Sequence, residues 1–133
     1  MQSIEIKPVE MKGWPLVTIK FNSPASDAEA RQWFADMSAM LARKEPFVMV
    51  MEAQPDSQFS PEARKEMSIW FKGNRSLLGE YCLGTARIVE SEEHGQRVVS
   101  DNMQKAMPFP MKAFLSRTDA IKWSEDKLRK EII

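Results

Sequence analysis

The chain has 133 residues, in which 19 lysines and arginines balance 19 aspartates and glutamates, so the formal net charge is zero. Because no excess of positive charge is present to hold a phosphate backbone, these numbers disfavour nucleic-acid binding. The length suits one domain that can bury a sizeable core without a metal or a disulfide.

The N-terminal part of the chain predicts two strands and a helix. Apolar and polar residues alternate over residues 4–11, which include Ile4 and Ile6, and Pro8 places this half-buried strand at an edge. Residues 16–21 are rich in β-branched side chains and should pair antiparallel with it. A capping box, Ser26 to Glu29, then opens a helix whose apolar stripe should pack on the sheet.

The central strand is predicted at residues 47–51, which are all apolar and show no alternation. This pattern is typical of a strand buried on both faces. The polar loop that follows ends in Ser60-Pro61-Glu62, with a capping hydroxyl, a proline at the first helical position and an acid in the first turn. We therefore expect a helix from Ser60. The loop just before it lies at the carboxyl end of the strand, where binding sites of α/β proteins usually occur.

The remaining elements follow the same alternation. We expect the second long helix over residues 60–81, a strand over 83–89 and a third helical segment over 91–107. A last strand over 111–116 and a final helix capped by Thr118-Asp119 follow. Strands that alternate with helices in a chain of this length imply a mainly parallel sheet with right-handed crossovers. The predicted fold is a single α/β domain over residues 1–133, with about five strands, the first antiparallel, and four helices.

Catalytic constellations are nearly absent from the sequence. His94 is the only histidine, and Glu92-Glu93-His94-Gly95 is typical of a solvated helix start. One histidine and one cysteine do not make a usual zinc ligand set, and no glycines have a phosphate-loop or dinucleotide-binding spacing. Glu52 and Asp56 are the best candidates for a general acid or base, and both are also suited to capping a loop. We expect no enzyme activity, no cofactor and no metal.

The cellular compartment is suggested by the single cysteine. Cys82 has no second cysteine to pair with in the chain, which suits a reducing environment. Charged residues interrupt the first 15 positions, unlike the apolar core of a secretory signal, and no apolar run is long enough to span a membrane. We expect a cytoplasmic protein.

A first candidate site is the loop after the central strand, with Asp56, Ser57 and Ser60. A hydroxyl at the start of a helix can accept a phosphate group, whose charge the helix dipole and the backbone amides stabilise. The alternative is that Ser60 only caps the helix and that Ser57 only forms a turn. We favour this plainer interpretation of the two hydroxyls.

A second candidate site is a pocket for an apolar ligand. The chain has ten methionines, which are flexible and polarizable, together with several large aromatic residues. The residues that we expect to line such a pocket are Met49, Met51, Trp70, Phe71 and Trp123. The alternative is that these side chains form ordinary core, which is the commoner role of aromatic residues at helical spacing.

The order of the elements and five segments of the sequence carry a family resemblance. The segments are residues 47–51, 62–75, 84–89, 97–99 and 114–123. They resemble the STAS-like, anti-sigma-factor-antagonist-like domains, in particular the bacterial branch grouped with CRAL-TRIO lipid-binding domains. The resemblance implies a superhelix of βα units with an antiparallel first strand. It also implies a serine-bearing regulatory loop, matched here only by Asp56-Ser57, or, from the CRAL-TRIO relatives, an apolar pocket.

Two functions follow as hypotheses. The first is a non-catalytic regulatory module that binds a protein partner through residues 56–60 and offers an edge strand for assembly into a homodimer. The alternative is a carrier or sensor of a lipid-like molecule, which predicts an apolar pocket of roughly 300 Å³ or more.

Overall fold

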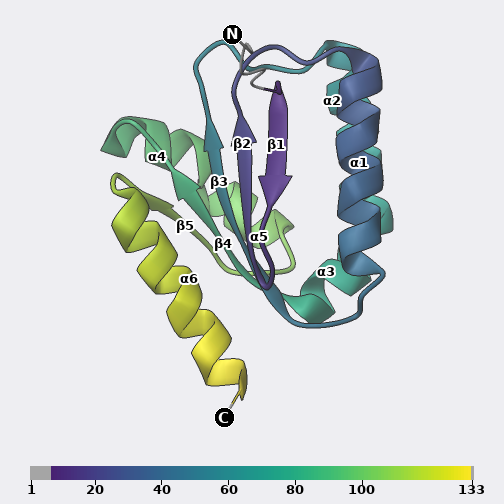
Figure 1. The fold of residues 1–133 in the computed structure, drawn as a ribbon. Coiled ribbons are helices and arrows are strands. Elements are labelled where there is room, and N and C mark those ends of the chain that lie inside the picture. Colours follow the sequence, from purple (N-terminus) through teal and green to yellow (C-terminus); the bar gives the residue numbers. More distant parts are fainter. Residues whose placement is uncertain (1–6, 133) are drawn as a thin grey trace, which may run out of the picture.

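Five strands form one sheet at the centre of the computed structural model, which describes residues 7–132 (Figure 1). They are β1 Val9–Lys12, β2 Leu16–Phe21, β3 Phe47–Ala53, β4 Cys82–Ile88 and β5 Met111–Phe114. The strands lie side by side in sequence order, β1 is antiparallel to β2, and the other neighbours are parallel. The predicted fold class is confirmed. Ile4 and Ile6 of the first predicted strand lie outside the described residues.

Within the described residues, the four predicted helices appear as six segments. They are α1 Asp27–Leu41, α2 Pro61–Gly73, α3 Arg75–Tyr81, α4 Glu92–Val98, α5 Asp101–Ala106 and α6 Arg117–Ile132. The second predicted helix breaks at Asn74, whose side-chain amide donates to the carbonyl of Trp70. The third breaks before Ser100, whose hydroxyl caps the amide of Met103. Both breaks arise because a short polar side chain competes with the helical hydrogen bonds.

Three of the four predicted helix starts are confirmed. Ser26 and Glu29 form both hydrogen bonds of the capping box, and Ser60 and Ser91 each accept a backbone N–H of the first turn. The prediction was wrong for the last helix, which is capped by the hydroxyl of Ser116 and not by Thr118. Strand β5 ends before Leu115, which is exposed, so this residue does not extend the alternation as expected.

Strand β3 is the central strand, as predicted. It pairs with β2 on one side and with β4 on the other, and its residues 47–51 are all buried. Side chains alternate between the two faces of a strand, so Met49 and Met51 face one layer and Val48 and Val50 face the opposite layer.

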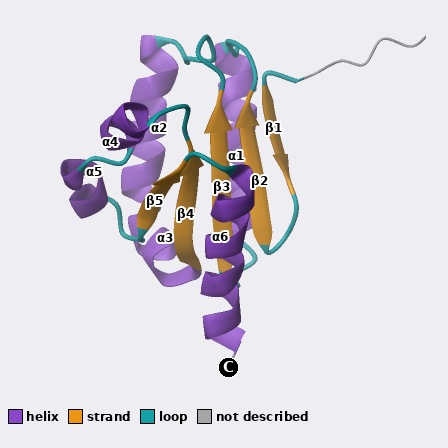
Figure 2. Ribbon diagram, turned by 90° about the vertical axis from the view of Figure 1, so that its left-hand side faces the viewer, coloured by secondary structure: helices purple, strands orange, loops and turns teal. Residues whose placement is uncertain are grey.

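The helices cover the two faces of the sheet unequally. Because strands β2 to β5 follow one another in sequence order, right-handed crossovers bring their connecting helices to the same side of the sheet. There, α1, α2 and α3 cover one face, and α4 and α5 flank the β5 edge (Figures 1 and 2). Helix α6 comes after the last strand and packs alone on the opposite face of β3 and β4. No helix within residues 7–132 combines the length and the apolar composition that are needed to cross a bilayer.

The core accordingly has two parts. The larger part lies between the sheet and α1 to α3 and includes Ile19, Met37 and Met49, all of which are almost completely buried. The smaller part lies under α6, where Val50 and Ala86 meet Ala120.

Candidate ligand-binding cavity

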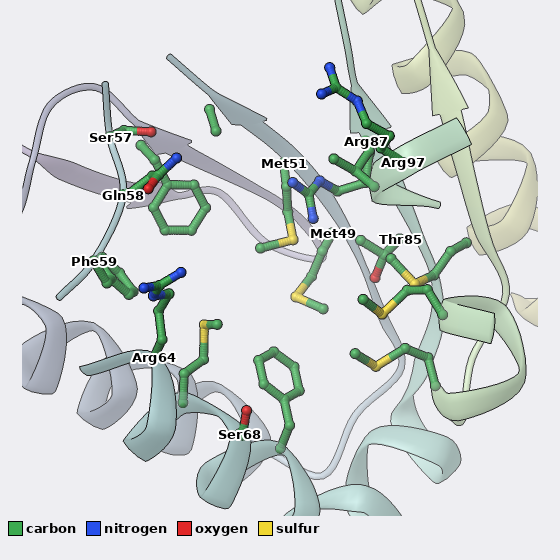
Figure 3. Close-up of a pocket in the computed structure, with 18 of the residues that line it drawn as sticks. Met49, Met51, Ser57, Gln58, Phe59, Arg64, Ser68, Thr85, Arg87 and Arg97 are labelled. Carbon is green, nitrogen blue, oxygen red and sulfur yellow. The ribbon is translucent and has the colours of Figure 1, made fainter. Parts of the chain in front are cut away.

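A partly open cavity of about 1170 Å³ lies between α2 and the α4–α5 segment, on the face of the sheet that carries Met49 (Figure 3). Pockets for small molecules usually have volumes of roughly 300–1,000 Å³, so this space is large enough for a ligand. The volume also exceeds the minimum that the hypothesis of an apolar ligand required.

The floor of the cavity is built by three neighbouring strands. In the sheet register, Met49 of β3 lies beside Thr85 of β4, which lies beside Met111 of β5, and Met51 lies beside Arg87. Residues that are neighbours in register project to the same face, so all five side chains point into the layer that holds the cavity. The floor is mainly sulfur and hydrocarbon, with one guanidinium at its end.

The two walls carry apolar side chains that the protein leaves partly uncovered. Met67 and Phe71 lie one turn apart on α2, and Met103 and Met107 approach from α5 and its end. All four are only half-buried, and α5 has no fully buried residue. Six of the ten methionines line this one space. The walls therefore have the composition of a core but lack the partner atoms that a core would supply.

The loop after β3 closes one side of the cavity and contains the predicted serine site. Ser57 is buried, and its hydroxyl donates to the carbonyl of Gln54 at 2.6 Å. The hydroxyl of Ser60 donates to Asp27 Oδ1 at 2.6 Å and accepts the amide of Ala63 at 3.0 Å. Asp56 is exposed. Both hydroxyls are thus engaged in local structure, and phosphorylation of either one stays a prediction.

The five predicted pocket residues do not all meet. Met49, Met51 and Phe71 line the cavity, but Trp70 turns towards α1, where its indole N–H donates to Ser38 at 2.9 Å. Trp123 belongs to α6 and lies on the opposite face of the sheet. The physical reason is that consecutive helical residues point about 100° apart, and that only the topology decides which face a helix covers.

The sequence reasoning missed a group of cations around the cavity. Five basic residues line it, and Glu90 is the only acidic residue among the described residues that do so. The basic residues are Arg64, Lys72, Arg75, Arg87 and Arg97. They come from four different elements, so no local sequence pattern connects them. Only Arg87 could have been noticed in the sequence, because an arginine within the apolar strand β4 is unusual.

Arg87 stands apart from the other cations because it is half-buried. Burial lowers the pKa of its guanidinium from the ordinary value. The group still carries its charge at neutral pH, since arginine is not deprotonated in proteins. Within residues 7–130, no carboxylate lies within 4.0 Å of the Arg64, Arg87 or Arg97 guanidinium.

The candidates for acid–base chemistry are dispersed. Glu52 lies on the opposite side of the sheet, 4.0 Å from Arg117. His94 lines the cavity, and its Nδ1 accepts the backbone N–H of Glu90 at 3.4 Å. The described part of the chain has no group of three or more histidine, cysteine or acidic side chains that could hold a metal ion. The arrangement is suited to holding an apolar molecule with a charged end.

Comparison with solved structures identifies the fold. An uncharacterised protein of the DUF3478 family with a SpoIIAA-like fold, from Shewanella loihica PV-4, superposes with a TM-score of 0.71. The two proteins are 14% identical, and the match covers 93% of this chain and 99% of the other. At this identity the similarity establishes the fold, and it confirms the STAS-like resemblance drawn from the sequence. No family model and no curated protein matches the chain.

Proposed function

We propose that this protein is a STAS-like binding module that holds an apolar small molecule in the cavity between α2 and the α4–α5 segment. The observation that carries the proposal is the set of half-buried side chains that face this space, Met67, Phe71, Met103 and Met107. A ligand would bury these side chains and so supply the free energy of binding, at about 25 cal/mol for each Å² of apolar surface removed from water.

The size of the space supports a role in binding. Protein interiors pack as densely as organic crystals, and voids larger than a water molecule are few. The partly open cavity of about 1170 Å³ leaves Met67, Phe71, Met103 and Met107 without full packing contacts on the side that faces it. Methionines adapt their shape to different neighbours, as a carrier or sensor of variable apolar molecules requires. Six of them surround the cavity.

We assign binding without catalysis. The ionisable groups at the cavity are mainly guanidinium and ammonium groups, which suit the fixing of a ligand better than the transfer of protons at neutral pH. Glu52, the acid expected at the end of the strand, faces the layer of α6. The fold agrees with this assignment, although a fold by itself does not imply a function.

The proposal is tested with the neutral fluorescent probe N-phenyl-1-naphthylamine. We expect saturable binding to the purified protein. Ser68→Trp should weaken this binding at least about tenfold, because Ser68 lies on the exposed side of α2 that borders the cavity. Ile69→Trp is the matched control, since Ile69 is exposed on the same helix and does not line the cavity. Its affinity should be unchanged.

Native mass spectrometry after gentle extraction provides a second test. A co-purified molecule of lipid-like mass should appear with the wild-type protein and decrease with Ser68→Trp. If the probe does not bind saturably, or if it binds Ser68→Trp as tightly as the wild type, the proposal is wrong.

A protein partner at the loop of residues 56–60 is a second candidate function. It is favoured by the position of Asp56, which is exposed at the border of the cavity beside Pro55. Asp56→Arg should abolish capture of this partner from a cell extract, whereas Glu125→Arg on α6 should not. Equal capture by both variants would remove this loop as the binding surface.

A further inference from the structure

The side chains around the cavity carry an excess of positive charge. The chain as a whole is neutral, yet among its described residues five basic side chains and one acidic side chain line this space. The guanidinium of Arg75 already donates a hydrogen bond to the carbonyl of Ala106. Arg64, Arg87 and Arg97 have no carboxylate partner among the side chains of residues 7–130. A ligand with a negative end would meet a complementary charge here, and a cationic ligand would be repelled.

The position of Arg87 also favours an anionic ligand. It lies beside Met51 in the sheet register and is half-buried against the apolar floor. A charge that is taken out of water without a partner is costly, and a bound anion relieves that cost. The fall in the pKa of Arg87, which burial causes, reports the same unfavourable environment.

The arginines also approach from different directions. Arg87 and Arg97 lie together on one side of the cavity, and Arg64 reaches in from α2 on the other, with Met49 and Met51 between them (Figure 3). Arg64 and Arg97 are exposed, so they stand at the mouth, whereas Arg87 stands at the boundary between the mouth and the floor. The cavity therefore has a basic mouth and an apolar floor.

We infer that the ligand is a single-chain anionic amphiphile with a carboxylate head, a molecule of the fatty-acid class. The acyl chain lies among Met67, Phe71 and Met103, and the carboxylate pairs with Arg87. Arg64 and Arg97 attract the head group at the mouth. This inference rests on the proposed function, since it names the chemical class of the molecule in the same cavity.

A carboxylate fits better than a phosphate monoester. One half-buried guanidinium is neutralised by one negative charge, and the flat fork of arginine matches a carboxylate with two parallel hydrogen bonds. A phosphate monoester carries about −1.5 to −2 charges at neutral pH. Next to Arg87 the excess charge would lie among apolar side chains, because Arg64 and Arg97 are exposed and stand at the mouth.

The test compares four probes that share a twelve-carbon chain and differ only in the head group. They are dodecanoate, dodecyl phosphate, dodecanol and dodecyltrimethylammonium. Each one displaces N-phenyl-1-naphthylamine at concentrations below micelle formation. We expect dodecanoate to bind at least about tenfold more tightly than dodecanol, because a hydrogen bond between two charged groups is stronger than one to a neutral hydroxyl. The cationic probe should bind most weakly.

Variants locate the head group. Arg87→Met should remove the preference for dodecanoate and leave the affinity for dodecanol nearly unchanged. Arg64→Met and Arg97→Met change exposed residues, so they should fold normally and weaken dodecanoate binding several-fold with a smaller dependence on salt. Arg129→Met is the control for the change in net charge, because Arg129 lies on α6 and pairs with Glu125. It should keep the preference.

The outcomes distinguish an error in the head-group assignment from a failure of the proposed ligand-binding function. If dodecanol binds as tightly as dodecanoate, or if Arg87→Met keeps the preference, the head-group assignment is wrong while the cavity remains a ligand site. Tighter binding of dodecyl phosphate would overturn the choice of a carboxylate. If neither the fluorescent probe nor any chain of the series binds, the proposed function itself fails.

Discussion

The indole ring of Trp123 lies directly on Gly84, so that α6 meets β4 at a point where the strand has no side chain. A Cβ atom on Gly84 would stand 2.8 Å from Cη2 of the ring and 3.1 Å from Cζ3. The ring fills the space that a side chain would need, and it packs there against the small core that Val50 and Ala86 form beneath α6.

Gly84→Ala should therefore destabilise the protein. The added methyl group would push the ring of Trp123 outward, and overpacking of this kind costs about 1–3 kcal/mol. Urea denaturation measures the loss of unfolding free energy. Gly73→Ala is the control: nothing lies within 4 Å of a Cβ at Gly73, the last residue of α2. That substitution should be neutral or stabilise by up to about 1 kcal/mol.

The hydrogen bond from Ser60 to Asp27 ties the start of α2 to the start of α1. Ser60→Ala removes both this bond and the cap on Ala63, and we expect a loss of about 1–2 kcal/mol in urea denaturation. Ser91→Ala removes only an exposed cap and should cost less.

Ser60→Asp tests whether this site tolerates a negative charge. The new carboxylate would face Asp27, so the variant should be less stable than Ser60→Ala, and Asp27→Asn should restore part of the loss. If Ser60→Asp were as stable as the wild type, the expectation that Asp27 disfavours a negative charge at position 60 would be wrong.

Cys82 should be unreactive in the folded protein. Burial raises the pKa of its thiol from 9.0 to about 11, against weaker opposing effects of hydrogen bonds to Thr85 and Gly84. Only the thiolate is nucleophilic, so labelling with Ellman's reagent near neutral pH should be slow in the native state and fast in urea. Rapid labelling of the native protein would contradict the burial of this side chain.

The same shift makes stability depend on pH. The thiol pKa is higher in the folded state, so the unfolded state loses its proton first as the pH rises. This contribution is fully present below about pH 9 and is lost between about pH 9 and 11. From about pH 8 to about pH 10 we expect a loss of roughly 1 kcal/mol that Cys82→Ala does not show.

Trp33 offers a different test of the core. Its indole N–H is the only buried side-chain polar atom without a hydrogen-bond partner among the described residues, and the side chain is 3% exposed. Trp33→Phe removes this donor, and the relief of about 1–3 kcal/mol should offset much of the lost packing. We expect a net change below about 1 kcal/mol by thermal denaturation, compared with about 3–5 kcal/mol for Trp33→Ala.

The parts of the fold that the sequence predicted are those with local causes. Residues 47–51 are buried as a continuous apolar run because a central parallel strand meets side chains on both faces. Ser26 and Ser60 start helices because a hydroxyl satisfies amides only three residues away. The break at Asn74 also has a local cause, since Gly73 interrupts the helical pattern there, but the apolar residues continue across it and predicted one helix.

The candidate site was only partly predictable, since Met49, Met51 and Phe71 line the cavity but Trp70 and Trp123 do not. Composition and local pattern determined the kinds of element, their order and the abundance of adaptable methionines. The tertiary structure alone decided that α6 takes Trp123 to the opposite face and that Arg64, Arg87 and Arg97 meet around one space. The physical reason is that side chains far apart in the chain become neighbours only through crossovers and strand register, which no local pattern of residues encodes.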